Sequence, residues 1–390
     1  MKKALRVMTV LSVVLASLSF ACLAGEIAGE LSENVAWSIK DGVLTVSGEG
    51  EMPNWSTKDA SPFTEKANLI EEIVIEDGIE NIGEYAFAQC RSLTSVEIAQ
   101  SVTEIGEGAF YSCSDLEEIY LPESVEEIWA NAFMNCNSLK SINIPEGVEY
   151  IPERLFHGCT DLVEVTLPDS LETIAEEAFY KCSSLSEIQL PDGLRDIERS
   201  AFAGCSSIES IEIPKGVKLD LYAFSKCTSL KTAYFEEGTN RIGGKKCFSG
   251  CENLLAVFIP ESVEDFADDI LELCRNASIY GEYGSCAEQY ADENDIPFAS
   301  VDEYEEGKII KREPVHIKEK RDIFGDINGD GEVTNRDAAA LMQYLAGWSN
   351  EEIIVPDDAD IKYDINGDGK LTNRDAARIM QYVAGWDVEF

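Results

Sequence analysis

Residues 105–127 read IGEGAFYSCSDLEEIYLPESVEE, and the same pattern returns along much of the chain. Cysteines mark it every 23 residues, at Cys90, Cys113, Cys136, Cys159, Cys182 and Cys205. The intervals are then 22, 24 and 23 residues, to Cys227, Cys251 and Cys274. Phenylalanines keep the 23-residue spacing from Phe87 to Phe202. A fixed period of this length predicts a solenoid, in which each repeat forms one turn and stacks on the next.

Each turn contains a predicted strand and a return segment. Ile119-Tyr120-Leu121 forms a short strand whose alternate residues point inward, and Pro122 ends it. Val125 and Ile128 are expected to be buried on the return. Residues 109–116 form the opposite wall, too short for more than one or two turns of helix. Strands stacked about 4.8 Å apart form one parallel sheet, and about ten turns span on the order of 45 Å.

The outward side chains of these strands are the candidate binding surface, because solenoids bind on their concave strand face. The main outward column is Val74, Glu97, Tyr120, Asn143, Thr166, Gln189, Glu212, Tyr234 and Phe258. A second column two residues earlier is Glu72, Ser95, Glu118, Ser141, Glu164, Glu187, Ser210, Thr232 and Ala256. The aromatics of the main column could stack on sugar rings or anchor a protein. The ordinary preference of strands for aromatic residues is the alternative.

The cysteines are expected to be free thiols. One cysteine in each turn, within an apolar pattern, predicts a buried ladder of small hydrophobic side chains rather than disulfides. Cys247 is expected to be core filler. Cys286 lies outside the pattern, and a bridge to Cys274 stays open.

The N-terminus predicts export from the cell. Residues 1–24 resemble a secretory signal, with cations at Lys2, Lys3 and Arg6 before an apolar stretch and a cut near Gly25. The alternative is a lipoprotein signal with Cys22 lipidated. We expect no direct membrane anchor otherwise, because no later stretch has the roughly 18 apolar residues needed to span a bilayer. The net charge of −43 argues against nucleic acid and anionic lipid partners.

Near the C-terminus a metal-binding loop occurs twice. Residues 326–337 read DINGDGEVTNRD, and residues 364–375 read DINGDGKLTNRD. Ca²⁺ takes about six to eight oxygen ligands, which an EF-hand-type loop supplies from positions 1, 3, 5, 7, 9 and 12 around a glycine at position 6. The predicted ligands are Asp326, Asn328, Asp330, Glu332, Thr334, Asp337, Asp364, Asn366, Asp368, Lys370, Thr372 and Asp375. Glu332 and Lys370 would contribute backbone carbonyls. The sequence therefore predicts two Ca²⁺ ions and metal-dependent folding.

A helix is predicted after each loop. Thr334 and Thr372 begin capping boxes, and Gly347 and Gly385 end the helices. Residues 323–390 resemble a type I dockerin, a small all-α calcium-binding module. The resemblance implies binding to a cohesin module of a scaffoldin in a cellulosome-type complex. It places cohesin recognition at Asn335, Arg336, Met342, Gln343, Asn373, Arg374, Met380 and Gln381. Because both copies keep these residues, either helix could lead the docking.

The 23-residue repeat resembles the leucine-rich repeats of BspA-like bacterial surface proteins. This implies a β-rich solenoid with a parallel sheet and short helical turns. The expected segments are the N-terminal cap (25–69), the repeats (70–265), the C-terminal cap (266–300), a basic linker (301–322) and the dockerin (323–390).

Catalytic residues are not expected. His157 lies at a tolerant outer position and His316 in the linker, and the sequence carries no metalloprotease histidine pair, phosphate loop or serine elbow. The favoured reading is a secreted, non-catalytic binding or adhesion protein, attached to the cell surface through a cohesin scaffold and holding a protein or glycan ligand. The alternatives are a polysaccharide-degrading component, since dockerins usually accompany glycoside hydrolases, and a regulator or inhibitor of neighbouring enzymes.

Overall fold

The computed structural model describes residues 26–304. The predicted signal peptide, the linker beyond Tyr304 and the dockerin-like segment lie outside the described residues. The chain divides into two units, Met1–Lys311 and Arg312–Phe390. All described residues belong to the first unit. The predicted ends of the signal peptide, the linker and the dockerin-like segment therefore stay predictions.

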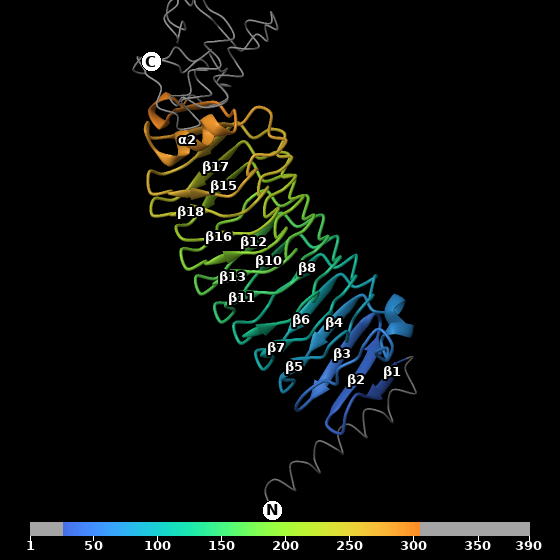
Figure 1. The fold of residues 1–390 in the computed structure, drawn as a ribbon. Helices are drawn as coiled ribbons and strands as arrows, with labels where there is room; N and C mark the ends of the chain where they lie inside the picture. Colours follow the sequence, from blue (N-terminus) through green and yellow to red (C-terminus); the bar gives the residue numbers. More distant parts are fainter. Residues whose placement is uncertain (1–25, 305–390) are drawn as a thin grey trace, which may run out of the picture. The chain divides into compact units, whose positions relative to one another are not determined.

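A parallel ladder of strands runs along the stacked turns, as the sequence predicts (Figure 1). Each strand pairs with its equivalent one turn later, for example Ser141 with Glu164. Its strands are β4 (Glu72–Ile75), β6 (Ser95–Ile98), β8 (Glu118–Ile119), β10 (Ser141–Asn143), β12 (Glu164–Thr166), β15 (Ser210–Ile213), β17 (Thr232–Phe235), β19 (Ala256–Phe258) and β21 (Ser278–Gly281). Between β12 and β15 the ladder is interrupted, because residues 187–190 contribute only an isolated bridge from Glu187 to Glu164.

A second parallel ladder corrects the prediction of a single sheet. It consists of two-residue strands: β5 (Asn81–Ile82), β7 (Glu104–Ile105), β9 (Glu127–Ile128), β11 (Tyr150–Ile151), β13 (Thr173–Ile174), β14 (Asp196–Ile197), β16 (Lys218–Leu219), β18 (Arg241–Ile242) and β20 (Asp265–Phe266). Val125 and Ile128 are buried as predicted.

Pro152 explains one gap in this second ladder. In neighbouring turns the residue after the strand donates its N–H to the preceding turn, as Trp129 does to Ile105 (2.9 Å) and Ala175 to Ile151 (2.9 Å). Proline has no N–H and cannot make this bond to Ile128. Strands β9 and β11 accordingly belong to separate sheets.

The remaining wall of each turn is a tight bend where the sequence allowed one or two turns of helix. Two residues four positions apart adopt left-handed backbone conformations, for example Asn131 (φ 60°) and Asn135 (φ 61°). This conformation directs their N–H groups to carbonyls of the next turn, at Glu153 (3.1 Å) and His157 (2.8 Å). The helices in residues 26–304 lie outside the repeating bends: η1 (Thr64–Leu69), α2 (Cys286–Glu293) and η2 (Val301–Glu303). None of them is long and apolar enough to cross a bilayer.

The core is built from the repeating phenylalanines and cysteines. Phenylalanine rings stack from Phe63 to Phe248, with centroids 5.1–5.7 Å apart. From Cys113 onward, each repeating cysteine donates a hydrogen bond from its thiol to the phenylalanine carbonyl of the preceding turn, as Cys159 does to Phe133 (3.1 Å). The structure confirms the buried ladder of free thiols, and it also buries Cys247. Cys286 is half-buried and donates to the Glu264 carbonyl (3.3 Å), so it forms no bridge with Cys274.

Both ends of this core are covered. Strands β1 (Ile27–Glu30), β2 (Val35–Lys40) and β3 (Val43–Gly48) form an antiparallel meander, and β3 pairs in parallel with β4. Asp41 (φ 50°) and Gly42 (φ 86°) make the two-residue turn between β2 and β3, where both residues need positive φ. At the other end β22 (Phe298–Ser300) pairs with β21, and helix α2 buries Tyr290 against the core.

We expect the ladder thiols to resist alkylation at pH 8 in the native protein. Burial raises the pKa of Cys90 and Cys136 from 9.0 to about 12, and the thiolate is the reactive form. The same shift links stability to pH. Because the pKa is higher in the folded protein than in the unfolded chain, the stability gained by burying the neutral thiol is complete below pH 9. It is lost as the pH rises from 9 towards 12.

Mass spectrometry after iodoacetamide treatment checks this expectation. The half-buried Cys286 should react first, and all the cysteines should react in denaturant. A ladder thiol alkylated at pH 8 without denaturant, or bridged in the unreduced protein, would contradict the buried ladder.

Candidate functional site

The predicted main column forms an outward row along the first ladder, with one interruption between β12 and β15. We call it the ladder face, and its residues are Glu97, Tyr120, Asn143, Thr166, Gln189, Glu212, Tyr234 and Phe258. Register pairs join its members directly, for example Asn143 with Thr166 and Glu212 with Tyr234. Asn143, Tyr234 and Phe258 are half-buried, and the other five are exposed. Gln189 lies in the interruption of the ladder, and Tyr120 directly follows β8 (Glu118–Ile119), so neither is in a strand. The strand predicted at residues 119–121 is therefore observed one residue earlier and ends before Tyr120.

The ladder face is acidic. Beside it the second column exposes carboxylates at Glu72, Glu118, Glu164 and Glu187. Neither column contains a lysine or arginine. Such a surface repels anionic ligands and favours neutral or cationic ones.

Aromatic side chains are stacked at the end of this row nearest the C-terminal cap. Tyr234 and Phe258 are nearly parallel, with centroids 4.3 Å apart, and Tyr280 stacks on the other side of Phe258 at 5.3 Å. Tyr304 packs edge-on against Phe258 (4.9 Å) and Tyr280 (5.1 Å). The sequence interpretation placed Tyr280 in the cap and missed it as the next member of the column, although it pairs in register with Phe258.

This stacking narrows the prediction for the three aromatics. Both ring faces of Phe258 are covered by neighbouring rings, so Phe258 offers no free face to a sugar. Tyr234 has one stacked neighbour, and Tyr120 is 59% exposed. Among the three aromatics, Tyr120 and Tyr234 are therefore the ones that leave a ring face open.

The second ladder carries exposed aromatics that the sequence interpretation did not single out. Trp129 is 50% exposed and Tyr150 is 48% exposed, in consecutive turns. The signal in the sequence was Trp129, which occupies a position held by Gly106 one turn earlier. Without knowledge of the second ladder, its outward direction could not be deduced.

His157 is packed against the side chains of Tyr180 and Glu177. Its ring stacks on Tyr180 with centroids 4.8 Å apart, and Nδ1 lies 3.4 Å from a carboxylate oxygen of Glu177. Burial lowers the pKa of His157 below its ordinary value, against the opposing effect of Glu177. The imidazole is therefore held mainly neutral at pH 7.

The predicted calcium-binding residues are not among those that the structure describes. Within residues 26–304 no group of three or more histidine, cysteine or acidic side chains is arranged to hold a metal ion. The twelve predicted calcium ligands and the eight predicted cohesin-binding residues lie outside the described residues.

Comparison with family models gives two matches. The "BspA type Leucine rich repeat region" matches six copies over residues 60–171 and 151–278, and the "Dockerin type I domain" matches residues 324–384. The second match covers both predicted calcium loops. No curated protein matches the chain.

Solved structures of bacterial leucine-rich repeat proteins are similar to the chain. A protein from Eubacterium ventriosum is 22% identical, with a TM-score of 0.40 over 65% of this chain and 84% of that one. One from Bacteroides ovatus is 22% identical, with a TM-score of 0.46 over 63% and 83%. The leucine-rich repeat protein of T. pallidum is 26% identical, with a TM-score of 0.39 over 52% and 91%.

Proposed function

Because the chain belongs to the family of BspA-type leucine-rich repeat proteins and carries a type I dockerin, we propose that it is a secreted, non-catalytic binding or adhesion protein. The solenoid presents the ligand-binding surface. The dockerin attaches that surface to a cohesin-bearing scaffoldin outside the cell, in a cellulosome-type complex.

The ladder face is the observation that carries this proposal. Where the strands pair, its side chains follow one another in register, as Asn143 and Thr166 do and as Glu212, Tyr234 and Phe258 do. The residues on either side of Tyr120, Ile119 and Leu121, are buried in the core. Packing of the core therefore does not explain why an aromatic residue occupies an exposed position such as Tyr120. Large exposed aromatics are favourable anchors for a partner, because they bury much apolar area at low cost in side-chain entropy.

The charge of the ladder face limits the ligand. A partner must approach Glu97, Glu212 and the carboxylates of the second column, so an anionic polymer would be repelled. A protein with a neutral or basic surface fits this face, and so does a neutral glycan that stacks on Tyr120 or Tyr234.

Attachment depends on calcium in this proposal. The loops that begin at Asp326 and Asp364 each hold one Ca²⁺ ion, which orders the helix that follows. Recognition of the cohesin falls to the repeated Asn-Arg and Met-Gln pairs, with Arg336 and Arg374 as the charged members.

Joint replacement of Tyr120 and Tyr234 by alanine should reduce ligand capture at least about tenfold, as expected when two central aromatic contacts are lost. The full-length variant would be immobilised and exposed to a panel of plant polysaccharides and to secreted bacterial proteins, with bound material quantified. The matched control is Tyr150→Ala, which removes a similarly exposed tyrosine from the second ladder.

Three outcomes would oppose the proposal. Equal capture by the Tyr120→Ala, Tyr234→Ala protein and the wild type would place the ligand elsewhere. Loss of capture in the Tyr150→Ala control would move the surface to the second ladder. Turnover of a polysaccharide that a single ladder-face carboxylate substitution abolishes would establish an enzyme.

A further inference from the structure

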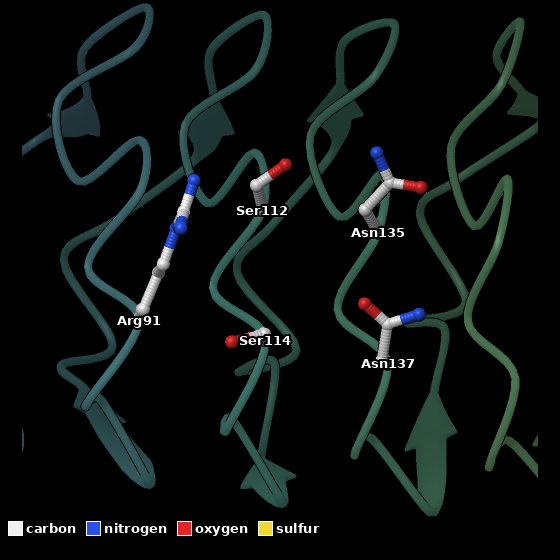
Figure 2. A pocket seen from close by; sticks show the side chains of 5 residues that line it. All are labelled: Arg91, Ser112, Ser114, Asn135 and Asn137. Atoms are coloured by element: carbon white, nitrogen blue, oxygen red, sulfur yellow. The ribbon is translucent and has the colours of Figure 1, made fainter.

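A shallow pocket of about 280 Å³ opens on the bend wall, away from the ladder face. We call it the bend pocket, and its lining residues are Arg91, Ser112, Ser114, Asn135 and Asn137. They come from three consecutive turns, with the two serines between Arg91 and the two asparagines (Figure 2). All five directly precede or follow a ladder cysteine.

The repeat itself directs these side chains outward. Ser112 (φ 58°) and Asn135 (φ 61°) occupy a left-handed position of the bend. Their backbone N–H groups donate hydrogen bonds of 2.8 Å to carbonyls of the next turn, from Ser112 to Met134 and from Asn135 to His157. Their side chains line the pocket.

Much of the hydrogen-bonding capacity in the bend pocket is unused. Within residues 26–304 the side chains of Arg91, Ser112 and Asn135 have no hydrogen-bond or ion-pair partner. Asn137 donates Nδ2 to the carbonyl of Gly158 (3.0 Å), which leaves its amide oxygen available. The Ser114 hydroxyl donates to the carboxylate of Asp115 (3.1 Å), which is itself not part of the lining.

Arg91 is one of two arginines in residues 26–304 that pair with no carboxylate, and the other is Arg275. Four of the six arginines in residues 26–304 pair with carboxylates, namely Arg154, Arg195, Arg199 and Arg241. Among the described residues Arg91 has no such pair and faces a pocket without a carboxylate in its lining. Its guanidinium is therefore available to an anionic group of a ligand.

We propose that the bend pocket binds one hexuronate unit, a sugar that carries a carboxylate. A guanidinium binds a carboxylate with two parallel hydrogen bonds. Serine hydroxyls and asparagine amides donate to and accept from ring hydroxyls. The volume lies near the lower end of small-molecule sites, about 300 Å³, and suits a single sugar unit.

The strongly negative net charge does not prevent this binding. At physiological ionic strength the field of exposed charges is screened over about 8 Å, so carboxylates far from the pocket contribute little. The nearby carboxylate of Asp115 already accepts a hydrogen bond from Ser114. This site is distinct from the ladder face in both position and charge preference.

The test compares glucuronate with glucose, because the two differ at C6 by the carboxylate. Saturation-transfer NMR on the full-length protein with calcium should show glucuronate binding, with glucose roughly tenfold weaker or undetectable, as expected for the loss of a charge-assisted pair. Arg91→Ala should weaken glucuronate binding by the same factor. Arg275→Ala, at the same repeat position but outside the pocket, should leave it unchanged.

Specific results would overturn the proposal. Absence of glucuronate binding, equal binding of glucose, or full binding by Arg91→Ala would each do so. Displacement of glucuronate by an equal concentration of acetate would show that the pocket binds the carboxylate alone and does not recognise the sugar. The Tyr120→Ala, Tyr234→Ala protein should bind glucuronate like the wild type, so failure of the ladder face and failure of the bend pocket are separable.

Discussion

Joint replacement of Asp326 and Asp364 by alanine should abolish calcium-dependent binding to cohesin. Each aspartate is the first ligand of its loop, and its loss removes a charged oxygen from a shell that needs several. Because calcium binding and folding of the module are coupled, weaker metal binding also costs order in the recognition helices. We expect cohesin affinity to fall at least about a hundredfold, or roughly 2.7 kcal/mol. Calorimetry with a panel of type I cohesins, with calcium and with EDTA, measures this.

The single variants provide the control for this prediction. Because both loops are followed by the same surface residues, Asp326→Ala alone should weaken binding less than the double variant. The unfolding transition of the solenoid should stay unchanged in all three proteins. Wild-type affinity in the double variant, or an equally strong complex in EDTA, would contradict a calcium-dependent dockerin.

Replacement of Phe156 by alanine should destabilise the solenoid by about 3–5 kcal/mol, as for other large-to-small core substitutions. The ring is fully buried between Phe133 (5.7 Å) and Phe179 (5.3 Å). In a solenoid each turn contacts only its neighbours, so a cavity in a central turn also uncouples the two halves. We expect a lower urea midpoint and a broader circular dichroism transition.

Tyr120→Ala is the matched control for that measurement. It also removes an aromatic ring, but one that is 59% exposed, so the expected change is within about 0.5 kcal/mol. If Phe156→Ala cost less than about 1 kcal/mol, the stacked phenylalanines would not be the main support of the core.

The first ladder and the core could be predicted because they depend on spacing alone. A cysteine and a phenylalanine that recur every 23 residues must occupy equivalent places in successive turns, and the structure buries both columns. The outward residues followed from alternation within each strand. For the same reason the ladder face could be read from the sequence.

The bends and the second ladder could not be predicted because their signals are weak. A two-residue strand such as β9 is too short to show alternation. The left-handed positions hold residues as different as Tyr85, Asn131 and Arg154, since they are imposed by hydrogen bonds between turns. The role of Pro152 in dividing the second ladder became visible only once that ladder was known.

Prediction of the candidate site from the repeat was incomplete, because residues outside the repeat also shape it. Phe258 was predicted as a stacking platform, but Tyr280 in the C-terminal cap stacks on it and Tyr304 packs edge-on against it. The bend pocket is lined by an arginine, two serines and two asparagines from three consecutive turns. The 23-residue period aligns these positions, but it does not predict that their side chains line a pocket.

The central claim is that the solenoid holds a ligand while the dockerin holds the scaffold. The most direct measurement loads the full-length protein with its captured ligand onto an immobilised cohesin and then washes with EDTA. We predict that the protein and its ligand elute together, with the ligand uncleaved. A ligand that stays on the cohesin, separates from the protein on loss of calcium, or is recovered as cleavage products would contradict the account.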